Sequence, residues 1–266
     1  MFYDFLQKYC VEIGQISEEE IHQDQKFLEI SVLFQWTDFK ASDDTFLYSQ
    51  LLSKVFKLLS PLEMTSLIDL GAGSCIPSII ALLANPHHEN LKITAVDNNP
   101  ETILTSKSNI LKAKLLQNYT LVQQDLLDFL RDLQYCPTQI IASNPPYLPV
   151  PANTTEENYR SVNGGPDGTK YLHSLLLAPL PAGTILVLEW SSLSNPSLIL
   201  PLIEKHYEVI FVQASRTPFG TYTGSYILQP YLEFQREQGK SVFFTDQNGQ
   251  HHFIIVGCIL RKKITL

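Results

Sequence analysis

The residues with the clearest chemical meaning follow a short apolar run at positions 139–142. Residues 143–147 read Ser-Asn-Pro-Pro-Tyr. A strand cannot continue through them, because the two prolines donate no backbone N–H and each favours extended geometry in the residue before it. The stiff turn would point the Asn144 amide, the Pro145 carbonyl and the Tyr147 ring into one space. Two acceptor oxygens and an aromatic face suit a planar NH2 group, although a purely structural proline-rich loop is the alternative interpretation of this segment alone.

Three upstream runs end in residues typical of a nucleotide site. Residues 66–77 read as a strand, a glycine turn and the start of a helix, with Gly71 and Gly73 in the turn. Glycine permits sharp turns and close approach to a ligand, and a helix N-terminus supplies N–H donors. Asp97 ends the second run, where a doubly wound fold carries the carboxylate that binds ribose hydroxyls, and Asp125 ends the third. For Asp69, Asp97 and Asp125, ordinary capping at strand ends is the alternative interpretation.

The order of glycine turn, two acids and Asn-Pro-Pro-Tyr resembles the class I S-adenosylmethionine-dependent methyltransferases. Within them it resembles the group that methylates amino nitrogens and carries Asn/Asp-Pro-Pro-Tyr. The resemblance covers about residues 43–190 and implies S-adenosyl-L-methionine as the cofactor. The four cysteines are isolated, with no Cys-x-x-Cys pair, and so predict no metal site. The resemblance assigns the acceptor nitrogen to Asn144, Pro145 and Tyr147. It assigns cofactor binding to Thr45, Phe46, Asp69, Gly71, Gly73, Asp97, Asn98, Asp125, Leu126 and Asn144.

The resemblance also gives these residues individual roles. Gly71 and Gly73 would pass the methionine part of the cofactor, and Asp97 would take the ribose hydroxyls. Asp125 and Leu126 would border the adenine. The segment 42–47 is similar to the one that closes over the cofactor in one branch of these enzymes, so Thr45 and Phe46 are predicted there. Cys75 stands where the family most often has a third glycine, and its Cβ must be accommodated in the loop.

A second motif narrows the resemblance. Residues 164–168 read Gly-Gly-Pro-Asp-Gly, similar to the Gly-Gly-x-Asp-Gly that follows Asn-Pro-Pro-Tyr in the HemK-type protein-glutamine N5-methyltransferases, which modify peptide-chain release factors. Glu157 falls where that family has a Glu before the two glycines. The implied substrate is therefore a glutamine side-chain amide of a protein, such as a release factor.

The elements that must position these residues alternate between strand and helix from about residue 62. This pattern predicts an α/β fold with a doubly wound, mostly parallel sheet, and the resemblance implies seven strands with an antiparallel last one, a Rossmann-like methyltransferase fold. The expected strands cover 66–70, 92–97, 119–124, 138–143, 184–190, 207–212 and 252–259. The expected helices cover 77–84, 100–116, 126–134, 168–178 and 196–206.

The sequence predicts a helical N-terminal extension over residues 1–60 and a methyltransferase domain over 61–266. Within the extension, helices are expected near residues 2–9, over 21–33 and through 46–59. Residues 216–250 are an insertion between the last two strands, rich in aromatic and polar residues. An added β-hairpin is the favoured interpretation of this insertion, and a substrate clamp is the alternative.

Composition limits the function classes. The 266 residues are 44% hydrophobic and 17% charged, as in ordinary globular proteins, with no apolar run long enough to cross a membrane. Four isolated cysteines predict reduced thiols and a cytoplasmic protein, and the His doublets at 87–88 and 251–252 are predicted to be solvated. The net charge of −8 disfavours a nucleic-acid partner, which needs Lys and Arg to neutralise phosphates. The sequence indicates no oligomeric state.

Three functions follow from these features. The first is an N-methyltransferase of HemK type acting on a protein glutamine. The second is an adenine N6-methyltransferase acting on RNA or DNA, because an adenine amine fits the same acceptors. The third, from another class, is a cofactor-binding or inactive partner protein, which Cys75 and the acidic composition motivate.

Overall fold

The computed structural model describes residues 1–9, 34–35, 42–60, 64–135, 139–154 and 159–264. The helix expected over 21–33 and the motif residue Glu157 lie outside these ranges. Within them, no helix is long and apolar enough to cross a membrane.

One mixed sheet forms the centre of the molecule. Its strand order is β3-β2-β1-β4-β5-β8-β6, and β7 pairs with β8 beyond this path. Strands β1 to β5 are parallel, whereas β8 runs antiparallel to both β5 and β6. The strands are β1 (Ser66–Leu70), β2 (Lys92–Asp97), β3 (Tyr119–Gln123), β4 (Gln139–Ser143), β5 (Ile185–Ser191), β6 (Tyr207–Pro218), β7 (Phe244–Thr245) and β8 (His251–Lys262). The predicted α/β fold with an antiparallel last strand is confirmed, and β7 is a short addition.

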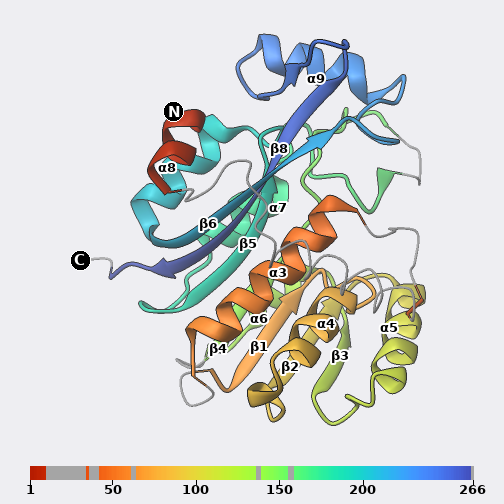
Figure 1. The fold of residues 1–266 in the computed structure, drawn as a ribbon, viewed down its shortest axis with the longest axis vertical. Coiled ribbons are helices and arrows are strands. Elements are labelled where there is room, and N and C mark those ends of the chain that lie inside the picture. The colour runs from red at the N-terminus through yellow and green to blue at the C-terminus, as the bar shows by residue number, and fades with distance from the viewer. Residues whose placement is uncertain (10–33, 36–41, 61–63, 136–138, 155–158, 265–266) are drawn as a thin grey trace.

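Helices cover both faces of the sheet (Figure 1). They are α1 (Phe2–Tyr9), α3 (Asp43–Leu58), α4 (Ile76–Ala84), the 3-10 turn η1 (Pro86–His88), α5 (Pro100–Lys112), α6 (Leu126–Asp132), α7 (Lys170–Leu177), α8 (Pro196–His206) and α9 (Leu228–Glu237). Buried side chains of α3 and α4 pack on one face, and those of α1, α6, α7 and α8 pack on the other. Since alternate residues of a strand point to opposite faces, each strand contributes to both cores.

The strand order reverses between β1 and β4. From β1 the chain adds β2 and then β3 on one side, and it then crosses back to place β4 and β5 on the other. In an open parallel sheet, ligands bind outside the carboxyl ends of the strands at such a reversal. The fold therefore puts the ends of β1 and β4, with the glycine turn and the Asn-Pro-Pro-Tyr segment, at the favoured place for a site.

The insertion after β6 differs from the prediction. Strand β6 runs on to Pro218, and the next regular element is the helix α9 rather than two strands of an added hairpin. Figure 1 shows α9 beside the far ends of β6 and β8. The helix forms because Leu228, Leu232 and Gln235 recur at helical spacing and are buried together. Beyond the end of β6, the two-residue β7 is the part of the insertion that pairs with β8.

Candidate active site

The Asn-Pro-Pro-Tyr segment leaves the carboxyl end of β4 next to the glycine turn. Leu70 at the end of β1 pairs with Ser143 at the end of β4. The Ser143 hydroxyl donates to the Leu70 carbonyl oxygen at 2.7 Å, which ties the two strand ends together. Asn144 follows at once and is partly exposed, whereas Pro145 and Tyr147 are buried. The two motifs that the sequence singled out therefore begin side by side.

The glycine turn has the left-handed backbone that its sequence predicts. Gly71 and Gly73 have φ angles of 71° and 55°, and Cys75 also has a positive φ of 60°. A residue with a Cβ costs about 1–2 kcal/mol in this conformation. The Cys75 side chain is nonetheless fully buried, in the cluster that includes Ile79 and Ile110. The loop thus keeps a glycine-like path at Cys75 and directs the side chain into the core.

Asp97, at the end of β2, joins this turn to the start of α5. Its two carboxylate oxygens accept the backbone N–H of Gly73 at 3.0 Å and that of Asn99 at 2.9 Å. Burial raises the pKa of Asp97, while these donors and the positive charge of Arg160 oppose the rise. Arg160 belongs to the long loop after Asn-Pro-Pro-Tyr, so that loop reaches the neighbourhood of Asp97. The next residue, Asn98, is exposed at the same edge.

Asp69 lies beneath the glycine turn with one oxygen satisfied. Tyr48 of α3 donates its hydroxyl to Oδ1 at 2.7 Å, while Oδ2 is buried and accepts no well-formed hydrogen bond. Burial raises the pKa of this carboxyl to about 6, although the nearby Tyr48 and Ser78 side chains lower it. A buried oxygen without a donor is costly unless a ligand supplies one, and the ammonium group of a bound amino-acid moiety could do so.

The remaining residues predicted to bind the cofactor also make contacts within the protein. Asp125 caps α6, because its carboxylate accepts the Leu127 N–H at 2.8 Å, so capping accounts for its place at a strand end. Leu126 lies opposite the glycine turn, with its Cδ2 3.6 Å from where a Cβ on Gly71 would lie. Thr45 is buried and accepts the Ser42 N–H at 3.4 Å at the start of α3, and Phe46 packs against the cluster around Cys75.

The Gly-Gly-Pro-Asp-Gly loop encloses the backbone of Tyr147. A Cβ on Gly164 would lie 2.8 Å from two Tyr147 backbone atoms, and a Cβ on Gly168 would lie 2.4 Å from the Tyr147 carbonyl oxygen. Ser194 donates its hydroxyl to the same oxygen at 2.9 Å. Asp167 holds the loop by accepting from Thr169 and from Asn195. The motif therefore has a local physical reason, since only glycine leaves room for the segment that follows Asn144.

Two buried carboxylates complete the site, and neither was predicted to be functional. Asp44, in the first turn of α3, accepts the Tyr147 hydroxyl at 3.2 Å. Glu189 on β5 is fully buried, and neither of its oxygens has a hydrogen-bond partner. Burial, and then the negative charge of Asp44, raise the pKa of Glu189 well above its usual range. Of the two, only Glu189 carried a signal in the sequence, as the one acid in an apolar strand.

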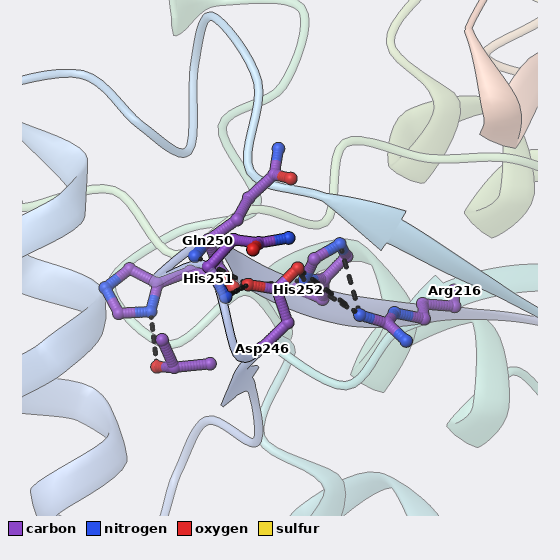
Figure 2. Close-up of polar contacts among 7 residues, drawn as sticks. Arg216, Asp246, Gln250, His251 and His252 are labelled. Atoms are coloured by element: carbon purple, nitrogen blue, oxygen red, sulfur yellow. Dashed lines mark hydrogen bonds and ion pairs between the residues drawn. The ribbon is translucent and has the colours of Figure 1, made fainter.

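A second polar cluster lies away from this site, where β7 pairs with the start of β8 (Figure 2). An Arg216 guanidinium nitrogen lies 3.9 Å from Asp246 and 3.3 Å from the His252 ring. His252 is buried, and so is His88, whose ring contacts the Phe56 carbonyl oxygen at 2.7 Å. The prediction that both doublets are solvated is wrong for these two rings, because each has a polar partner inside the protein. Across the described chain, no three His, Cys, Asp or Glu residues are grouped to hold a metal ion.

Comparison with known proteins agrees with this geometry. Residues 45–158 match the family model of the methyltransferase small domain. A release factor glutamine methyltransferase of Moorella thermoacetica is 30% identical over 172 residues, which cover 60% of this chain and 59% of the relative. A tRNA1(Val) (adenine(37)-N6)-methyltransferase of Histophilus somni is 32% identical over 86 residues, 32% of this chain and 35% of the relative. The matches therefore cover less than two thirds of either relative's length, 59% of the first and 35% of the second.

A solved structure extends the agreement to the fold. The crystal structure of an RNA methyltransferase candidate from Pyrococcus horikoshii superposes with a TM-score of 0.53 at 12% identity, covering 94% of this chain and all of that one. At this identity the likeness concerns the fold alone. The family match over residues 45–158, the curated relatives and the Rossmann-like fold together support an S-adenosylmethionine-dependent methyltransferase.

Proposed function

We propose that this protein is an S-adenosylmethionine-dependent N-methyltransferase that acts on a glutamine side-chain amide of a protein, such as a peptide-chain release factor. The observation that carries the proposal is the enclosure of Tyr147 by Gly164 and Gly168. It fixes the Asn-Pro-Pro-Tyr segment and links it physically to the second motif of the release-factor enzymes. The relative that carries this activity in its name also matches 60% of the chain, against 32% for the tRNA relative.

The residues around the glycine turn suit the cofactor. Asp69 has a buried oxygen that accepts no well-formed hydrogen bond, and Leu126 of α6 faces the turn at Gly71. Asp97 would hold the ribose hydroxyls while its carboxylate also orders the turn through the Gly73 N–H. When bound, S-adenosylmethionine supplies a methyl group that is already activated for transfer.

The chain itself must then orient a poor nucleophile. An amide nitrogen is weakly nucleophilic because its lone pair is conjugated with the carbonyl group. The Asn144 side-chain oxygen and the Pro145 carbonyl oxygen would accept its two N–H bonds and thereby aim the nitrogen. The same oxygens favour the positive charge that develops on nitrogen during transfer, which is the usual source of large rate effects at preorganised sites. The Tyr147 ring would pack against the planar group and exclude water.

A labelling experiment tests the proposal. Purified protein incubated with methyl-labelled S-adenosylmethionine and a peptide-chain release factor should put the label on one glutamine. The same reaction with tRNA serves as the competing arm, because the tRNA adenine methyltransferases are also similar to residues of this chain. Label in tRNA and none in the release factor would overturn the glutamine assignment in favour of an adenine N6-methyltransferase.

A further inference from the structure

Asp44 bridges the start of α3 and the Asn-Pro-Pro-Tyr segment. Its Oδ1 is occupied within the helix start, by the Ser42 hydroxyl and by the Thr45 N–H at 2.8 Å. Its Oδ2 faces the other way and accepts the Tyr147 hydroxyl at 3.2 Å. The Asn144 side chain is a further hydrogen-bond partner of the same carboxylate. Asp44 is therefore a buried acid that contacts both functional side chains of the segment.

This contact decides which end of the Asn144 amide faces the acceptor. An Asn side chain has an oxygen that accepts and a nitrogen that donates, with nearly the same shape, so its orientation follows from its hydrogen-bond partners. An ionised carboxylate can only accept. It therefore draws the Asn144 Nδ2 towards itself and leaves Oδ1 free to accept an N–H from a substrate NH2 group. With the opposite orientation, Asn144 would present a donor to another donor.

We propose that Asp44 is a positioning residue that locks the Asn144 amide with its oxygen towards the acceptor nitrogen and holds the Tyr147 ring beside it. The inference deepens the proposed N-methyltransferase function and rests on it. Asp44 does not touch the substrate; it acts through Asn144 and Tyr147. Residues 42–47, which the resemblance places over the cofactor, would thus also position the residues that bind the acceptor nitrogen.

The charges around Asp44 make this lock sensitive to pH. The described titratable groups that interact with Asp44 are Tyr147, which donates its hydroxyl to it, and Glu189 of β5, which its charge affects. Among the ion pairs found in the described ranges, none joins Asp44 to a cation. Burial raises the pKa of Asp44, and its four hydrogen-bond partners oppose the rise. Below that pKa a protonated Asp44 can donate to Asn144 and stabilise the reversed amide, so the lock should fail as pH falls.

The first test follows the Asn144 side-chain amide by NMR and requires no methyl transfer. In 15N-labelled protein, the Asn144 side-chain amide signal, identified by its loss in Asn144→Ala, should shift with pH as Asp44 titrates. In Asp44→Asn the same signal should stay constant. A wild-type Asn144 amide signal that does not move between pH 4 and pH 8 would overturn the proposal, whether or not an acceptor has been found.

The second test uses single-turnover methylation of the release factor at saturating cofactor. Asp44→Asn should lower the rate constant by about 10- to 100-fold, because a neutral amide can also donate and so permits both orientations. Binding of the cofactor should change less than threefold, and the fall in rate towards low pH that the proposal predicts for wild type should be absent from the variant. Asp43→Asn, the exposed neighbour, removes the same charge from the same helix turn and should leave both rate and pH profile unchanged.

The outcomes separate the two proposals. An Asp44→Asn protein with the rate and pH profile of wild type would refute the positioning role while leaving the methyltransferase intact. A wild-type protein that labels neither release factor nor tRNA, but whose Asn144 signal follows Asp44, would refute the proposed function alone.

Discussion

Asn144 and Asp97 lie at the same edge of the sheet, but their substitution should affect different steps. Changing Asn144 should lower turnover, and changing Asp97 should weaken cofactor binding. Asn144→Ala removes the side-chain acceptor and leaves the glycine turn untouched, since Asn144 makes no contact with that turn among the described hydrogen bonds. We expect cofactor affinity close to that of wild type and a loss of turnover of about 100-fold or more, typical for one preorganised electrostatic contact. Single-turnover rates at saturating cofactor measure this. Equal rates for the variant and wild type would mean that Asn-Pro-Pro-Tyr is only a turn.

Asp97→Ala should act on the cofactor instead. The change removes the proposed ribose contact and also the acceptor for the Gly73 and Asn99 N–H groups, so the turn itself loses order. We expect cofactor binding to weaken by about 1.5–3 kcal/mol, the range for hydrogen bonds to a charged group. Calorimetric titration with the demethylated cofactor measures the loss, and Asp97→Asn, which keeps one acceptor oxygen, should lose less. An unchanged dissociation constant in folded Asp97→Ala would move the ribose contact elsewhere.

At the scale of elements, the loop over residues 164–168 packs on the Tyr147 backbone and so holds the Asn-Pro-Pro-Tyr segment in place. Gly168 has a φ of 76°, and a Cβ there would lie 2.4 Å from the Tyr147 carbonyl oxygen. Gly239 has a φ of 70°, but a Cβ there would meet no atom within 4 Å. The pair therefore separates backbone strain, which both positions share, from the clash with Tyr147, which only Gly168 has.

Gly168→Ala should cost more stability than Gly239→Ala by about 1–3 kcal/mol, the usual penalty of forcing an extra carbon into a packed site. It should also lower turnover, because the clash displaces Tyr147 and with it Asn144. Gly239→Ala should keep wild-type activity. Urea unfolding and single-turnover rates on both variants measure the two effects. Equal losses in the two variants would show that the loop does not position the segment.

The order of the helices and strands could be predicted from the sequence, because it depends on periodicity and on residues at the strand ends, which are signals within short stretches of the chain. The strand ends at Asp97 and Ser143 and the helix start at Asp125 are such local signals. Glu189 is visible in the sequence only as the single acid of an apolar strand, and Asp44 could not be assigned in this way. Asp44 contacts Tyr147 because α3 packs across the sheet, and a contact between residues so far apart leaves no spacing in the sequence. The helix α9 was missed for a different reason: its aromatic and polar composition outweighed the spacing of Leu228 and Leu232.

For the whole molecule, the distribution of buried acids is unusual. Asp44 lies in the first turn of α3, Asp69 accepts a hydrogen bond from Tyr48 of that helix, and Glu189 lies on β5, which α3 contacts. Burial raises the pKa of each of the three. A carboxyl whose pKa is raised in the folded state holds its proton more tightly there than in the unfolded chain. Its contribution to stability is complete below the ordinary carboxyl pKa and is lost as pH rises towards the folded-state value. These three carboxyls should therefore lower the stability of the protein as pH rises above about 4, with the Asp69 contribution lost by about pH 6.

Glu189→Gln tests how much of this loss of stability with rising pH comes from Glu189, whose pKa is raised well above its usual range. Glutamine has the shape of a protonated glutamate and cannot ionise, so the variant should approach wild type below the ordinary glutamate pKa of 4.5, where Glu189 is protonated in both the folded and the unfolded chain. As pH rises, each unit between the ordinary and the raised pKa costs wild type up to about 1.4 kcal/mol that the variant does not lose. Urea unfolding at pH 5 and pH 8 should show the variant gaining on wild type at the higher pH. The exposed Glu237→Gln should follow wild type at both, because water solvates that carboxylate in either state. Parallel pH profiles for Glu189→Gln and wild type would mean that Glu189 finds a compensating partner in solution, and the buried acids would then not set the pH dependence of stability.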